Sequence, residues 1–125
     1  MKFISIAAAA LLLFSCAKNV EEDLTVDDPD AEPENVTYSG TISPLITSSC
    51  ATTGCHSGST PTAGLNLETY DKVMTLVTPN DLSKSYLYGV ITHTQLPKMP
   101  KNASKLADSD IENVKTWILN GAKND

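Results

Sequence analysis

Two cysteines and a histidine stand together in the sequence Cys50-Ala-Thr-Thr-Gly-Cys55-His56. Two thiols followed directly by an imidazole form the pattern by which haem c is attached, because each thiol adds to one vinyl group of the ring. The histidine then binds the iron as proximal ligand. The usual gap between the cysteines is two residues, and here it is four. Thr52–Gly54 can absorb the excess, because glycine tolerates the positive φ of a bulged turn.

Two other uses of the same thiols remain open at this point. Cys50 and Cys55 could pair as a disulfide in an oxidising compartment, and the chain would then be a structural or binding protein without haem. Together with His56 and His93, the two cysteines also make up the donor set of a Cys2His2 zinc site.

The first residues have the pattern of a targeting segment. Lys2 supplies a positive charge, and an apolar run extends from Ile4 to Phe14, as in a secretory signal peptide. The run is too short to span a bilayer, which takes about 20 apolar residues. Leu13-Phe14-Ser15-Cys16 resembles a bacterial lipobox, which predicts removal of residues 1–15 and lipidation of the Cys16 thiol. Several acyl chains would anchor the protein stably; ordinary cleavage would instead leave Cys16 as a free thiol.

Residues 16–35 are predicted to be an acidic, flexible tether. They contain eight acidic residues against one lysine, together with Pro29 and Pro33. Such a segment cannot bury enough apolar surface to order itself. Residues 36–125 carry seven lysines and seven acidic residues, so the net charge of −6 arises in the N-terminal part. This neutral domain has no basic excess that would predict binding to nucleic acid.

The remaining 36–125 domain shows the hydrophobic spacing of helices joined by loops. We expect a short helix that opens at Pro44, two helices over residues 67–77 and 83–92, and a final helix. Ser109–Glu112 resembles a capping box, and Gly121 is placed as a helix stop. The buried stripe of the final helix is predicted to be Ile111, Val114, Trp117 and Ile118. Since no alternating strand pattern competes, the expected fold class is all-α.

Further segments before and after the cysteine and histidine pattern come in a familiar order. These are Ile42–Ile46, Gly64–Leu67, Ser85–Tyr88, Met99-Pro100, Leu106–Glu112 and Trp117–Ala122. With them, residues 40–122 resemble a monohaem cytochrome c domain of the planctomycete-type or related class I-like kind. The resemblance implies a small helical domain wrapped around one covalent haem c. It also implies attachment through Cys50 and Cys55, with His56 as proximal and Met99 as distal iron ligand.

Met99 is also favoured by its own setting. It is a thioether in a proline-rich loop just ahead of the final helix. His93 is the rival distal ligand, since a neutral imidazole also binds iron. Met74 lies on a regular helical face and is expected to be core filler. A third possibility is an open, five-coordinate iron, as in a haem enzyme.

Taken together, these patterns predict a lipid-anchored c-type cytochrome that carries single electrons in the bacterial cell envelope. Ala17 after the lipidated cysteine suggests the outer membrane, with the domain facing the periplasm or the cell surface. The sequence shows no substrate-processing set of residues, so we do not expect an enzyme. Lys98, Lys101 and Lys105 flank Met99 and are either solvated loop residues or a positive rim that steers an acidic redox partner. The main alternative is a lipoprotein with a Cys50–Cys55 disulfide and no haem.

Overall fold

The final helix buries the apolar stripe that its spacing predicts. In the computed structural model, which describes residues 35–125, this helix is α4 (Asp108–Leu119). All four residues of the stripe are buried, and Trp117 is only 1% exposed. Gly121 follows with φ +93°, the left-handed conformation that ends helices and suits glycine. The predicted capping box is wrong, because the helix begins before Ser109 and its N-cap, Ala107, makes no side-chain hydrogen bond.

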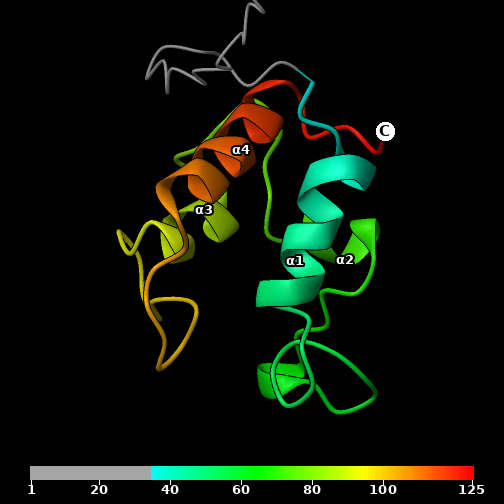
Figure 1. Ribbon diagram of the computed structural model, residues 1–125, viewed down its shortest axis with the longest axis vertical. Helices are drawn as coiled ribbons and strands as arrows, with labels where there is room; N and C mark the ends of the chain where they lie inside the picture. Colours follow the sequence, from blue (N-terminus) through cyan, green and yellow to red (C-terminus); the bar gives the residue numbers. More distant parts are fainter. Residues whose placement is uncertain (1–34) are drawn as a thin grey trace, which may run out of the picture.

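The described residues form helices and turns, and no strand occurs among residues 35–125. The elements are the π-helical turn η1 (Tyr38–Ile42), α1 (Ser43–Ser49), the 3-10 turn η2 (Thr62–Gly64), α2 (Tyr70–Met74), α3 (Tyr86–Ile91) and α4. Helices α3 and α4 lie on one side of the fold, and α1 and α2 lie on the other (Figure 1). The all-α prediction is confirmed. In this part of the chain, no helix has the length and apolar character of a bilayer span.

Helices α2 and α3 are shorter than their hydrophobic spacing predicts. Leu67 and Val77 are buried but lie outside α2, because the backbone around them forms turns. The turn before α3 is held by Ser85, whose Oγ lies 2.7 Å from the carbonyl oxygen of Asp81 and accepts a hydrogen bond from the Thr78 amide at 3.0 Å. A serine that bonds to nearby backbone in this way competes with helix formation, so α3 starts only at Tyr86.

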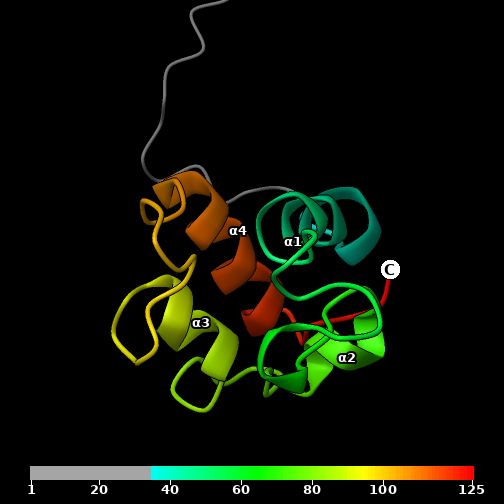
Figure 2. The same cartoon turned by 90° about the horizontal axis from the view of Figure 1, so that it is seen from below.

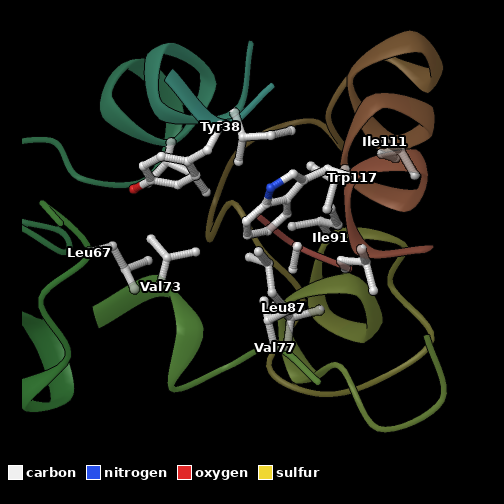
Figure 3. Packing of buried hydrophobic residues seen from close by; sticks show 14 residues of the cluster. Tyr38, Leu67, Val73, Val77, Leu87, Ile91, Ile111 and Trp117 are labelled. Atoms are coloured by element: carbon white, nitrogen blue, oxygen red, sulfur yellow. The ribbon is translucent and has the colours of Figure 1, made fainter. Parts of the chain in front are cut away.

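An aromatic cluster joins the two ends of the domain (Figure 3). The ring of Tyr38 lies 5.0 Å from that of Tyr70 and 5.7 Å from that of Trp117. Trp117 Nε1 donates to the carbonyl oxygen of Lys123 at 3.0 Å, and the amide of Tyr38 donates to Asp125 at 2.7 Å. These contacts close the end of the fold at which the C-terminus lies. The loops that follow α1 and α3 lie at the opposite end (Figure 1).

The predicted signal peptide, the lipidation site Cys16 and the tether fall almost wholly on residues 1–34 and therefore lie outside the described residues. The assignments of these three segments remain predictions from the sequence.

Candidate haem-binding site

An apolar cavity of about 280 Å³ lies among the helices and loops. Figure 2 shows α4 running into the middle of the domain, with α1, α2 and α3 around it. Most of the cavity wall is aliphatic or aromatic, and it comes from Ala63, Leu65, Leu67, Leu76, Tyr86, Leu87, Val90, Ile91 and Pro97. Cys50, His56 and Met99 add two sulfur atoms and an imidazole. A concave, mostly apolar site with a few convergent polar groups is typical of cofactor binding.

A second cavity, of about 230 Å³, borders the same three side chains. Cys55 and Gly54 line it, together with the Pro100–Asn102 stretch of the opposite loop. Cys50, His56 and Met99 therefore stand where the two cavities adjoin, and Cys55 faces the second one.

The segment between the cysteines folds as a closed loop. Helix α1 ends at Ser49, and Cys50 is its C-cap. The amide of Cys55 donates to the carbonyl oxygen of Thr52 at 2.9 Å, and the amide of His56 donates to that of Cys50 at 3.2 Å. Gly54 has φ +83°, a conformation that glycine adopts at little cost. Gly54 thus has the positive φ that the sequence suggested, while the accommodation of the two extra residues for haem attachment stays a prediction.

The two thiols differ in their surroundings. Cys50 is half-buried and Cys55 is exposed, and both are free cysteines. Burial, with a smaller contribution from the charge of Cys55, raises the pKa of the Cys50 thiol to about 11. The alternative zinc site is not formed, because residues 35–125 contain no group of three or more His, Cys, Asp or Glu side chains placed to hold a metal ion.

The ring of His56 is oriented by a backbone contact. Its Nδ1 lies 3.0 Å from the carbonyl oxygen of Leu65. A carbonyl oxygen can only accept, so Nδ1 carries the hydrogen and Nε2 keeps its lone pair. A hydrogen bond at the ring nitrogen that does not bind the metal fixes the tautomer and orientation of a metal-binding histidine. The carbonyl oxygen of His56 itself accepts from the amide of Leu67 at 2.8 Å, which secures the same loop.

Met99 and His93, the two rivals for the distal position, are separated by the structure. Met99 is half-buried, packs against the core and lines both cavities. His93 lines neither cavity, and its Nε2 lies 3.0 Å from the carbonyl oxygen of Met99. Met74 packs against the core without reaching the cavities. Of the three candidates, the structure therefore places only Met99 where a cofactor would lie.

Comparison with protein families agrees with this arrangement. Residues 53–103 match the family described as planctomycete cytochrome C. This match supports a cytochrome c-type domain in the chain. No curated protein and no solved structure matches the chain. The matched segment begins after Cys50 and includes Cys55, His56 and Met99.

The cytochrome c family that the chain matches implies a covalently bound haem c, and the residues around the cavities fit that group. The cavity wall is apolar, two thiols lie beside it, and His56 presents a free ring nitrogen. The contacts that orient this set were not visible in the sequence. The contact of Leu65 with His56 depends on the direction of a carbonyl group, which the spacing of residues in the sequence does not reveal.

The three lysines around Met99 differ in whether they form an ion pair. Lys105 Nζ forms an ion pair with Asp108 at 3.0 Å, so its charge is largely balanced. Lys98 and Lys101 are exposed, and Lys101 borders the second cavity. Any positive rim beside the site therefore depends on these two residues.

Proposed function

We propose that this protein is a lipid-anchored monohaem cytochrome c that carries single electrons in the bacterial cell envelope. The observation that supports it best is the convergence of Cys50, His56 and Met99 on one apolar cavity, in a chain whose residues 53–103 match a cytochrome c family. Haem c, when bound, supplies one-electron chemistry at its iron. No second cofactor is needed for this role.

Each residue of the set has its own task. Cys50 and Cys55 would hold the haem through two thioether bonds. His56 would supply Nε2 to the iron, and Met99 would supply its sulfur. Ligation by one histidine and one methionine would raise the reduction potential relative to two histidines. The aliphatic walls exclude water and would also raise the reduction potential, because a low dielectric disfavours the extra charge of the oxidised iron.

The partners are proposed to be redox proteins that approach beside α3. Tyr86 and Pro97 line the cavity, and the neighbouring Leu96 is 77% exposed. The hydroxyl of Tyr86 donates to the carbonyl oxygen of Leu96 at 3.0 Å, which holds this apolar surface next to the site. Lys98 and Lys101 add positive charge nearby. An acidic partner would be steered to such a surface.

Anchoring is proposed from the sequence, through lipidation of Cys16 in the outer membrane. The tether to Asn35 would reach roughly 60 Å from the bilayer when fully stretched. Replacement of Cys16 by Ala should release the protein from membranes, as measured by fractionation and by loss of labelling with a radioactive fatty acid. Retention of Cys16→Ala in the membrane fraction would contradict the anchor but not the haem site.

Visible absorbance of the protein matured in a haem-attaching host tests the central claim. An electron carrier with histidine and methionine ligands gives a low-spin spectrum with a methionine-to-iron charge-transfer band. A high-spin spectrum would indicate an open iron and an enzyme instead. If the Soret band is absent, the protein is a structural or binding lipoprotein.

A further inference from the structure

We propose that His93 is a positioning residue that holds Met99 in place through its main chain. This inference rests on the proposed function, in which Met99 is the distal ligand. In this role His93 is not a ligand of the iron. Its ring holds the main chain of the loop that carries Met99 and does not contact the haem.

Both peptide groups of Met99 are held. Its amide donates to the carbonyl oxygen of Val90 at 3.0 Å, and Val90 lies on α3 and lines the cavity. Its carbonyl oxygen accepts from His93 Nε2 at 3.0 Å. Because the backbone is fixed on both sides, the thioether can reach only a small region. This restriction favours binding by a weak, neutral ligand such as a thioether, because the side chain loses little further orientational freedom when it binds.

The loop that carries His93 is folded tightly onto α3. The carbonyl oxygen of Gly89 lies 3.0 Å from the amides of both Thr94 and Gln95. The side chain of Gln95 covers Gly89 so closely that a Cβ there would lie 2.5 Å from the Gln95 amide oxygen. The loop that includes His93 therefore lies close to α3.

The backbone of His93 has a φ of +63°, and five other non-glycine residues among residues 35–125 also have a positive φ. Histidine is one of the residue types that tolerate this left-handed region. The conformation therefore does not by itself indicate a role, and the proposal depends on the hydrogen bond to Met99.

The position of the ring separates the two roles of His93. The carbonyl oxygen of Met99 can only accept, so Nε2 of His93 carries the hydrogen of this bond. The ring lines neither cavity, so His93 would have to leave its present position to act as the distal ligand.

The test uses the full, haem-loaded chain with two substitutions at this position. His93→Gln keeps an N–H at a similar reach, whereas His93→Leu removes the donor at similar volume. In His93→Leu we expect a weakened charge-transfer band and imidazole binding that is about tenfold tighter, the factor expected for the loss of one hydrogen bond. His93→Gln should stay near the wild type. Asn80→Leu is the control for backbone strain, since Asn80 is exposed and has φ +61°.

The outcomes distinguish this proposal from the proposed function. If the wild type shows methionine ligation but His93→Leu matches it, the positioning role is wrong. It is also wrong if His93→Gln is as defective as His93→Leu, because the hydrogen bond would then not matter. If His93→Leu loses the low-spin spectrum while Met99→Ala keeps it, the distal assignment in the proposed function fails. Should His93→Leu not accumulate, NMR of the reduced wild type decides, and a fast-exchanging His93 Nε2 proton would overturn the proposal.

Discussion

His56 donates a hydrogen bond from Nδ1 to the carbonyl oxygen of Leu65, over 3.0 Å. Together with the bond from the Leu67 amide to the carbonyl oxygen of His56, this contact links the loop that follows α1 to the segment that leads into α2. In the neutral ring it leaves Nε2 as the nitrogen able to bind a metal. The imidazole is thus oriented by a backbone carbonyl rather than by a charged side chain.

The first prediction concerns covalent attachment. Since Cys50 and Cys55 both border the second cavity, we expect haem to stay with the protein during acid-acetone extraction. Cys50→Ser and Cys55→Ser should each weaken retention, and the double variant should abolish it. Complete stripping of haem from the wild type would show that the thioether bonds do not form.

The second prediction concerns the distal ligand. Met99→Ala should give a high-spin or ligand-accessible iron and a large fall in midpoint potential, because the thioether stabilises reduced iron. The covalent haem should be kept. Met74→Leu is the matched control, because Met74 packs against the core away from the cavities, and its spectrum should equal that of the wild type. A low-spin spectrum that survives in Met99→Ala would exclude Met99 as ligand.

The third prediction concerns stability. Trp117 is 1% exposed and contacts Tyr38, so Trp117→Ala should lower the free energy of unfolding by about 3–5 kcal/mol. Denaturant titration of the holoprotein measures this. Leu119→Ala, on the same helix but at a residue that is 44% exposed, should cost far less. Equal losses for the two variants would mean that Trp117 is not central to the core.

The fourth prediction concerns the folding of the protein without haem. A domain of this size with so large an apolar cavity should depend on haem to complete its core. We expect protein expressed without haem attachment to be largely unfolded by circular dichroism. A cooperative thermal transition near that of the holoprotein would contradict this dependence.

The fifth prediction concerns docking. Lys98→Glu combined with Lys101→Glu should slow electron transfer to an acidic partner, and the loss should shrink as salt rises, because exposed charges are screened beyond about 8 Å. Lys84→Glu is the control, because Lys84 pairs with Asp81 on the turn before α3. Association rates at low salt measure the effect. If the double variant and Lys84→Glu behave alike, Lys98 and Lys101 are ordinary solvated residues.

The sequence alone predicted the class of fold and the chemistry of the site. The thiols and imidazole of Cys50, Cys55 and His56 are neighbours in the chain, so their pattern is visible without a structure. The stripe of α4 is likewise local, because residues three and four apart share one face of a helix. The need for a positive φ at Gly54 also followed from local reasoning, and the structure confirms it.

Tertiary structure decided what depends on distant partners. Helices α2 and α3 are short because buried turns produce the same apolar spacing as a helix, and only contacts such as that of Ser85 with Asp81 separate the two. The choice between Met99 and His93 was open in the sequence, since both side chains can bind iron. The fold of one loop onto α3 favours Met99, because it places Met99 at the cavities and His93 beside the main chain of Met99. The directions of side chains within a loop follow from its hydrogen bonds and not from its composition.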